Sequence, residues 1–357
     1  MELKNIELIN FRNYKYQKIE FINGINLFVG NNAQGKTNII ESIYISAFGK
    51  SYRTVKDNEI INFESEFSKI NLEYSKDDIN NKINYSIDRL NRKNILKNDV
   101  KIRKLSDHVG DIPIVLFSPD SLDIVKGAPA KRREFINMIA SQLSKNYLIA
   151  LQEYNKCLKI KNSCLKKDFV DREYLKILND KMSVYIEKIV NFRKLIIEKI
   201  LEKAKIIEKN VTNGKEDIFL KYETDFLNMT SQQINDILNK YMEIEIMKKS
   251  SMKGIQRDDV IIYVNNLEVA KYGSQGQNRT ALLSLKLADY EVLKEVKHEN
   301  PILLLDDIMS ELDGQRISYL LKYIENCQSI ITTTDSSFVK EVKNIKISKV
   351  LSGRLEI

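Results

Sequence analysis

A run near the N-terminus has the residue types and spacing of a phosphate-binding loop. The run Gly30-Asn31-Asn32-Ala33-Gln34-Gly35-Lys36-Thr37 matches GxxxxGK[ST] in full. Its glycines would let backbone N–H groups curl around a phosphate, which Lys36 could also reach. Thr37 offers a hydroxyl to Mg²⁺, and a helix is expected from about Asn38. A chance glycine turn is the alternative, but the strand before the loop and the helix after it favour a site for a nucleotide and Mg²⁺.

Two carboxylates follow an apolar run far along the chain. Asp306 and Asp307 come directly after Ile302-Leu303-Leu304-Leu305, as at the end of a buried parallel strand. We expect Asp306 to hold Mg²⁺ through water. Asp307 would act as a base that orients the attacking water, so Asp307 and Lys36 are the candidate catalytic residues. A solvated turn is the alternative, and it explains this pair poorly.

A second loop, Ser274-Gln275-Gly276-Gln277, also opens a helical segment but carries no lysine. A Ser-x-Gly-Gln loop shortly before such a strand resembles the signature motif of ABC-type ATPases. In that class two heads enclose two ATP molecules, and the signature loop of one head caps the γ-phosphate held by the other. The resemblance implies that Ser274, Gly276 and Gln277 complete the ATP site of a second copy, which supplies the lysine.

Further blocks make the resemblance more specific. They are LINFRNY, GNNAQGKTNIIESIYISAFGKSYRT, FSPDSLDIVKGAPAKRREFIN, RDDV, YGSQGQNRTALLSLKLA, PILLLDDIMSELDGQR and ITTTD, and they extend from Leu8 to Asp335. Together they resemble the RecF family of SMC-like ATPases of bacterial recombination and gap repair. The resemblance implies an α/β ABC-type ATPase head: a mixed sheet around the phosphate loop, with an inserted, mainly helical second lobe.

The resemblance also assigns roles outside the two loops. Ser310-Glu311-Leu312-Asp313 resembles the D-loop, which crosses the dimer interface of such heads, and Asp313 is its candidate nucleotide contact. Arg12, in FRNY, and Arg53, in SYRT, resemble basic positions that approach the nucleotide. Ordinary surface arginines are the alternative at both positions.

The chain departs from related ATPases at several positions. Thr332 to Thr334 stand where many ABC ATPases carry a switch histidine, which favours slow hydrolysis. Gln256 and Tyr52 stand where the RecF family commonly has histidine. Any role that depends on those imidazoles is therefore not expected here.

Apolar spacing predicts the elements that position these residues. The first third reads as short strands around one helix, NIIESIYISAF. From about Lys131 to Lys248 the chain is rich in Lys and Glu, lacks proline and has helical periodicity. Its long apolar stripe could form a coiled-coil hairpin or the helices of a compact lobe. The heptad breaks at Arg193, which favours the lobe.

The last third returns to strands and helices. VIIYVNNLEVAKYG predicts a hairpin around Asn265-Asn266, and PILLLDD and QSIITTTD predict buried strands on either side of a helix over about 315–325. Together with the strands of the first third, these strands predict a sheet built from both ends of the chain. We expect the first ATPase lobe at 1–118 and 299–357, and the helical lobe, which includes the signature motif, at 119–298.

Composition limits the class of partner and compartment. The net charge of +8 over 357 residues fits a polyanion, although a general bias toward Lys, Asn and Ile could also produce it. Three cysteines without a CxxC pair and two isolated histidines favour a reducing compartment and argue against a zinc site. No stretch approaches the ~18 apolar residues of a membrane span. We expect a cytoplasmic, nucleoid-associated protein with no membrane partner.

The resemblance implies an ATP-gated dimeric clamp on double-stranded DNA near single-strand/double-strand junctions. ATP and Mg²⁺ would be its cofactors, its DNA-stimulated ATPase would be weak, and RecR-like and RecO-like proteins would help it to load recombinase. We expect one of three basic clusters to contact DNA phosphates, and the third could instead serve folding or the dimer interface. The clusters are Arg89, Arg92 and Lys93; Lys101, Arg103 and Lys104; and Lys131, Arg132 and Arg133.

Three other functions fit part of the pattern. A transporter motor predicts a shorter chain, a switch histidine and a membrane partner. An SMC protein with a long coiled coil needs more residues than lie between the early and late strands. A small-molecule kinase leaves the second loop and the D-loop unexplained.

Overall fold

The computed structural model describes residues 1–336 and 344–356, without the side chains of residues 310 and 311. Contacts along the chain divide it into unit 1, Met1–Ser121 with Lys286–Ile357, and unit 2, Leu122–Leu285. The second boundary falls inside the helix α9 (Gln275–Lys297). The expected lobes, 1–118 with 299–357 and 119–298, remain a prediction.

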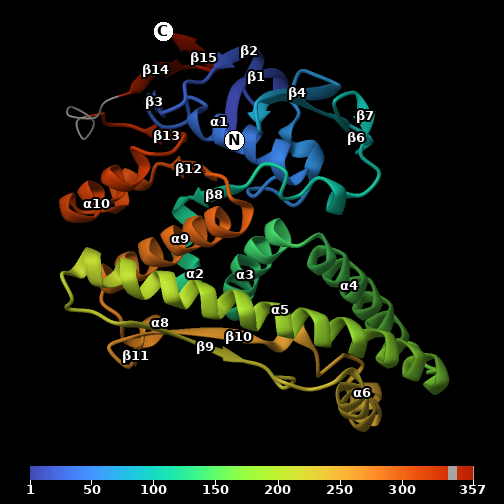
Figure 1. Ribbon diagram of the computed structural model, residues 1–357. Helices are drawn as coiled ribbons and strands as arrows, with labels where there is room; N and C mark the ends of the chain where they lie inside the picture. The colour runs from blue at the N-terminus through green and yellow to red at the C-terminus, as the bar shows by residue number, and fades with distance from the viewer. Residues whose placement is uncertain (337–343, 357) are drawn as a thin grey trace. The chain divides into compact units, whose positions relative to one another are not determined.

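One sheet of unit 1 is built from both ends of the chain, as predicted, in the order β15-β14-β3-β13-β12-β8 (Figure 1). All its neighbouring strands run parallel except β14 and β15. Every residue of β12 and β13 is buried, so both faces of these strands need apolar side chains. The strands are β3 (Ile25–Val29), β8 (Ile114–Phe117), β12 (Ile302–Asp306), β13 (Ser329–Thr333), β14 (Ile345–Leu351) and β15 (Arg354–Glu356).

A second, antiparallel sheet of unit 1 comes only from the first third of the chain, in the order β2-β1-β4-β5-β6-β7. Its strands alternate buried and exposed residues, which is the pattern that predicted them. Their separation from the first sheet was not predicted. The strands are β1 (Glu2–Phe11), β2 (Tyr14–Glu20), β4 (Phe67–Lys76), β5 (Ile79–Asp88), β6 (Lys93–Lys97) and β7 (Val100–Lys101).

The helix α1 (Lys36–Phe48) contacts both sheets of unit 1: β12 and β13 of the first, and β4 and β5 of the second. All but two of its residues, Thr37 and Asn38, are buried. A helix enclosed on both sides must be largely apolar all round, which is why NIIESIYISAF has little polar face. Its N-terminus, where the phosphate loop ends, is thereby held against the β12 edge.

Unit 2 is mainly helical, as predicted, but one part of the predicted helical region is a strand. β9 (Ile218–Glu223) pairs antiparallel with β10 (Asp259–Val264). Only its partner, far along the chain, makes this short alternating segment a strand. The predicted hairpin is present: β10 pairs with β11 (Leu267–Glu268) across Asn265 and Asn266, whose φ angles are 49° and 65°.

The helices of unit 2 are α2 (Asp123–Lys126), α3 (Pro129–Leu143), α4 (Lys145–Leu165), α5 (Arg172–Thr212), α6 (Ser231–Lys240), α7 (Met242–Lys248), α8 (Val269–Tyr272) and the first part of α9. Unit 1 also contains α10 (Gly314–Ile324). Short 3₁₀ helices lie at Asp57–Ile60, Leu105–Asp107, Pro119–Leu122, Ile255–Arg257 and Ile308–Glu311. Across residues 1–336 and 344–356, no helix is both long and apolar enough to cross a membrane.

The residue that breaks the heptad of α5 has a structural reason to do so. Arg193 is buried, and its guanidinium donates to Asp258 Oδ2 at 2.7 Å and to Asn137 Oδ1 at 2.9 Å. Tyr222 donates to the same Asp258 oxygen at 2.6 Å. A buried ion pair of this kind is stable only when its remaining hydrogen bonds are satisfied. Arg193 therefore joins α5 to α3 and to the RDDV block, as a compact lobe requires.

One buried carboxyl of α9 gives the fold a testable pH dependence. Asp289 is buried, and this burial raises its pKa to about 7, against the opposing charge of Lys286. The folded pKa of Asp289 lies above the unfolded value of 3.8. The stability that the protonated Asp289 carboxyl contributes is therefore full below about pH 4, and it is lost as the pH rises through 7. Asp289→Asn removes this loss. We expect the free energy of unfolding of the variant, relative to the unmodified protein, to rise by about 1–3 kcal/mol between pH 5 and pH 8.

Urea unfolding at four pH values between 5 and 8 measures this difference. Glu198→Gln, which removes an exposed carboxylate of α5, is the matched control and should leave the pH profile unchanged. Parallel profiles for Asp289→Asn and the unmodified protein would contradict the assignment.

Candidate functional site

The phosphate loop lies between β3 and α1, as predicted. Gly35 forms the N-cap of α1 with a φ of 111°, a conformation that side chains disfavour. A Cβ atom on Gly30 would lie 2.4 Å from the backbone oxygen of Val350, so only glycine fits there. Asn31, Asn32 and Ala33 are exposed at the tip of the loop. The two glycines thus meet the steric demands that the motif predicts.

Lys36 is buried within its own loop. Its Nζ donates to the carbonyl oxygens of Gly30 at 2.6 Å and Asn31 at 2.9 Å. Burial lowers the pKa of Lys36, and the neighbouring carboxylates of Asp307 and Asp306 oppose that shift. The ammonium group is therefore held at the centre of the loop, on the side of the two predicted carboxylates.

The structure brings Thr37 and Asp306 together, although 269 positions separate them in the sequence. The Thr37 hydroxyl donates to Asp306 Oδ1 at 2.8 Å. Thr332 donates to the same oxygen at 2.8 Å, and the Tyr52 hydroxyl donates to Oδ2 at 3.1 Å. Burial and the Asp306 carboxylate raise the pKa of Tyr52 well above its ordinary value, so its hydroxyl stays protonated. Asp306 is thus surrounded by three hydroxyl groups.

The donor set at this point fits a magnesium ion with bound phosphate. Mg²⁺ prefers oxygen ligands and commonly uses one or two carboxylates together with phosphate oxygens and water. The Thr37 hydroxyl and the Asp306 carboxylate supply such oxygens. Within the described part of the chain, no group of three or more His, Cys, Asp and Glu side chains could hold a metal ion. A magnesium site here would therefore need the phosphates of the nucleotide.

Asp307 follows the last residue of β12 and has an unusual backbone. Its φ of 52° lies in the left-handed region, which non-glycine residues seldom adopt. Its N–H donates to the backbone oxygen and to the side-chain oxygen of Thr332, both at 3.1 Å. Strain of this kind is often found at functional sites, where the surrounding structure maintains it. The geometry is compatible with the predicted role of Asp307 as a base.

The turn between β1 and β2 braces the phosphate loop. Asn13 Nδ2 donates to the carbonyl of Gln34 at 3.0 Å, and the Tyr14 hydroxyl donates to that of Gly35 at 3.1 Å. Asn38, at the start of α1, donates to Asn13 Oδ1 at 2.8 Å. The N-terminal block FRNY therefore contributes structurally to the loop.

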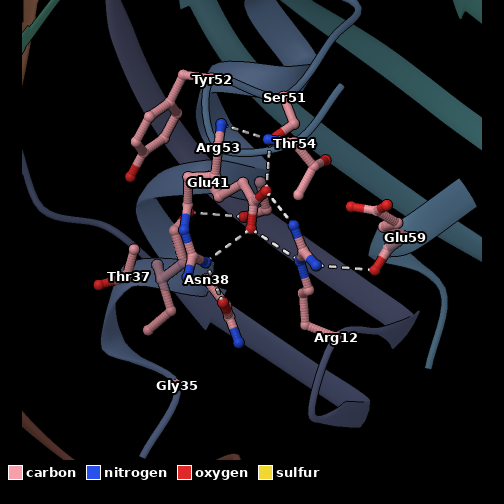
Figure 2. Close-up of polar contacts among 12 residues, drawn as sticks. Arg12, Gly35, Thr37, Asn38, Glu41, Ser51, Tyr52, Arg53, Thr54 and Glu59 are labelled. Carbon is pink, nitrogen blue, oxygen red and sulfur yellow. Dashed lines mark hydrogen bonds and ion pairs between the residues drawn. The ribbon is translucent and has the colours of Figure 1, made fainter. Parts of the chain in front are cut away.

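Arg12 and Arg53, both predicted near the nucleotide, meet at one buried carboxylate. Figure 2 shows the Glu41 carboxylate between their guanidinium groups. Arg12 forms two hydrogen bonds with it, from Nη2 at 2.6 Å and Nε at 3.0 Å, and Arg53 Nη1 lies 3.1 Å from Oε2. Arg53 Nη1 also donates to Asn38 Oδ1 at 2.8 Å. The two arginines are thus adjacent to the phosphate loop.

The second loop forms the N-terminus of α9 within unit 2. The exposed Ser274 accepts the N–H of Gln277 at 3.2 Å, while Gln277 Oε1 accepts the N–H of Ser274 at 3.0 Å. This reciprocal pair is a capping box, so both residues already have a structural role in starting the helix. The carbonyl of Gly276 accepts the Thr280 hydroxyl at 3.0 Å. Because the Ser274 oxygen is the acceptor in this pair, its hydroxyl proton remains able to donate.

Asp313 forms the N-cap of α10. Its Oδ1 accepts the N–H of Arg316 at 3.0 Å, and its carboxylate pairs with the Arg316 guanidinium. Asp313 thus caps the N-terminus of α10, a position at which aspartate is preferred. The side chains of the predicted D-loop residues Ser310 and Glu311 lie outside the described residues.

Several residues of the site were not predicted. Glu41 and Asn13 had no predicted role, and Thr332 and Tyr52 were noted only as residues that stand in place of a histidine. For Glu41 a signal existed, because a lone carboxylate in an otherwise apolar helix requires a cationic partner. Gln256, the other replacement for histidine, accepts a hydrogen bond from the Tyr154 hydroxyl within unit 2.

The sequence matches a protein-family model over nearly its whole length. The model describes the RecF/RecN/SMC N-terminal domain and covers residues 2–354. Curated relatives include the DNA replication and repair protein RecF of Clostridium perfringens, 40% identical over 100% of both chains. The protein of the same name from Clostridioides difficile is 38% identical over 99% of this chain and 97% of its own.

Solved structures agree with the sequence relatives. The recombination mediator protein RecF with ATP, in the RecFOR pathway, is 33% identical, with a TM-score of 0.90 over 99% of this chain and 97% of that chain. An SMC head bound to the C-terminal winged-helix domain of ScpA shares the fold, at 15% identity with a TM-score of 0.60 over 100% of this chain and 96% of that chain. The expected α/β ABC-type ATPase head is therefore confirmed. The chain belongs to the RecF family of DNA replication and repair proteins, a family of SMC-type ATPases.

Proposed function

We propose that the chain is a weak, DNA-stimulated ATPase that closes as an ATP-dependent homodimer on double-stranded DNA near single-strand/double-strand junctions. One observation carries the proposal: unit 1 contains a phosphate loop and its carboxylates, while unit 2 exposes a serine loop without a lysine. Two copies would combine these halves into complete sites. Closure would follow from tighter ATP binding in the dimer, and hydrolysis would reopen it.

The residues of unit 1 would bind ATP and Mg²⁺ in this proposal. Lys36 and the loop backbone would hold the phosphates, with Thr37 and Asp306 as the metal ligands. The bound ion would neutralise charge on the phosphates. Asp307 would orient water, and Ser274 of the second copy would donate to the γ-phosphate. The RecFOR context of the related structures supports RecO-like and RecR-like partners in recombinase loading.

The contacts of the three basic clusters favour one of them as the DNA surface. In the first, Arg89 donates to Asn62 O at 2.7 Å, and Lys93 pairs with Asp57 at 2.6 Å. In the third, Arg132 pairs with Asp259 at 2.7 Å. These side chains serve the fold, which is one of the two alternatives expected for the third cluster.

The second cluster has the opposite character. The side chains of Lys101, Arg103 and Lys104 are exposed and form no ion pair or hydrogen bond with any residue that the structure describes. Three free cations close together suit phosphate contacts without base specificity. We therefore assign the DNA contact of unit 1 to this cluster.

DNA binding with and without ATP tests the proposal. Fluorescence anisotropy on duplex, single-stranded and junction DNA, with light scattering for the oligomeric state, should show ATP-dependent dimers that bind duplex and junction DNA. Binding that does not depend on DNA structure or ATP, or no binding at all, would contradict it.

A charge-reversal triple at Lys101, Arg103 and Lys104, each to Glu, should weaken duplex binding by about tenfold or more. It should also reduce the slope of log K against log salt by about 2–3, because each phosphate contact contributes about one. The control reverses three exposed lysines of unit 2, Lys166, Lys167 and Lys248, and has the same net charge. Equal losses in both triples would indicate a general charge effect.

A further inference from the structure

The most unusual charged group outside the predicted set is the carboxylate of Glu41. Its side chain is fully buried, whereas those of Arg12 and Arg53 are 18% and 39% exposed. Burying a carboxylate is unfavourable unless it is paired and hydrogen-bonded. Glu41 meets this condition: Oε1 accepts Arg12 and the Ser51 hydroxyl, at 2.6 and 2.5 Å, and Oε2 accepts Arg12 and Arg53.

Glu41 fixes two separate segments beside the phosphate loop. Arg12 belongs to the β1–β2 turn and has a φ of 51°, which arginine seldom adopts. Ser51, bonded to Glu41, accepts the N–H groups of Arg53 and Thr54 at 2.9 and 3.2 Å, so it orders the segment after α1. Figure 2 shows both segments converging on Glu41, which belongs to α1. One carboxylate therefore orients both arginines.

The cluster leaves positive charge next to the loop. Two guanidinium groups share one carboxylate, so the formal charge of the three side chains is positive. Arg53 reaches Asn38, the residue after Thr37, at 2.8 Å. In the same β1–β2 turn, the side-chain amide of Asn13 donates to the backbone carbonyl of Gln34 in the loop at 3.0 Å. The partly exposed guanidinium groups are thus oriented donors with capacity for a further anion.

We infer that Glu41 is a positioning residue, which holds Arg12 and Arg53 in the geometry that binds the phosphates of the nucleotide. This inference rests on the proposed function of the phosphate loop. The alternative is that Glu41 only balances charge, in which case it weakens the attraction of the two arginines for an anion. The two readings predict opposite signs when the carboxylate is neutralised.

The test is the ATP affinity of Glu41→Gln, measured by isothermal titration calorimetry with Mg²⁺. Positioning predicts about tenfold weaker binding, because the amide cannot hold two guanidinium groups. Charge balancing predicts tighter binding. Glu59→Gln is the matched control: it makes the same charge change on an exposed residue whose backbone oxygen, not its carboxylate, accepts Arg12 at 2.8 Å. It should bind ATP as the unmodified protein does.

A double-mutant cycle separates positioning from general loss of structure. Arg53→Met alone should weaken ATP binding. In the Glu41→Gln background the same substitution should cause a much smaller further loss of ATP affinity, because the orientation of Arg53 is already lost there. Full additivity, or tighter binding by Glu41→Gln, would overturn the inference. Thermal unfolding without nucleotide reports whether each variant is folded.

If Glu41→Gln does not fold, Arg53→Lys keeps the charge but loses the planar fork. Positioning predicts weaker ATP binding for this variant, and unchanged affinity would overturn it. A different result would contradict the proposed function itself: no ATP binding by the unmodified protein. If the unmodified protein binds ATP and Glu41→Gln binds it with the same affinity, only this inference is wrong.

Discussion

Lys36→Ala is expected to abolish ATP binding, with a loss of affinity of about 100-fold or more. The lysine is the cation at the centre of the loop, where its Nζ donates to Gly30 and Asn31 oxygens at 2.6 and 2.9 Å. An ammonium held in this way can bond a phosphate with little further ordering of the side chain. The methyl group of alanine can neither donate to the loop carbonyl oxygens nor bond a phosphate. Calorimetric titration with ATP and Mg²⁺ measures the effect.

The control for this variant is Lys50→Ala, which removes an exposed lysine just after α1. It should bind ATP normally, because a surface charge near a site contributes little in water. Thermal unfolding must show that Lys36→Ala is folded. A folded Lys36→Ala variant that bound ATP with unchanged affinity would show that the loop does not hold the phosphates.

Ser274→Arg is expected to leave ATP binding intact and to prevent ATP-dependent dimerisation, with weaker retention of DNA. Ser274 is exposed at the N-terminus of α9, where a small donor could approach a phosphate bound by another copy. A long cationic side chain would fill that space. Light scattering with ATP measures the dimer, and calorimetry measures the nucleotide.

The capping box makes a second variant necessary. Ser274→Arg also loses the bond from the Gln277 N–H, which costs about 1 kcal/mol of stability in a typical cap. Ser274→Ala loses the same cap and the same hydroxyl donor without adding bulk or charge. It therefore separates the effect of the arginine side chain from those losses, and it should dimerise better than Ser274→Arg. Loss of ATP binding by the Ser274→Arg monomer would show that the serine does not act in trans.

Local patterns in the sequence predicted the phosphate loop, the buried strand before Asp306 and Asp307, and the hairpin at Asn265 and Asn266. Each depends on interactions within a few residues, such as glycine φ angles, continuous apolar runs or turn chemistry. The same patterns predicted α1, because its apolar residues recur with helical spacing. The strand β9 was missed because its short alternation becomes a strand only when β10 pairs with it.

The sequence by itself determined the ATPase class and the ends of the chain that build its sheet, since both rest on local motifs and on a family resemblance. Only the tertiary structure decided which charges are partners. The motifs predicted Thr37 and Asp306 at one magnesium site, and their hydrogen bond agrees with that placement. Nothing in the spacing, however, joins Glu41 to Arg12 and Arg53, or Asp306 to Tyr52 and Thr332. Such pairs form because parallel strands and the helix between the sheets bring distant segments to one edge, and burial then selects partners for each charge.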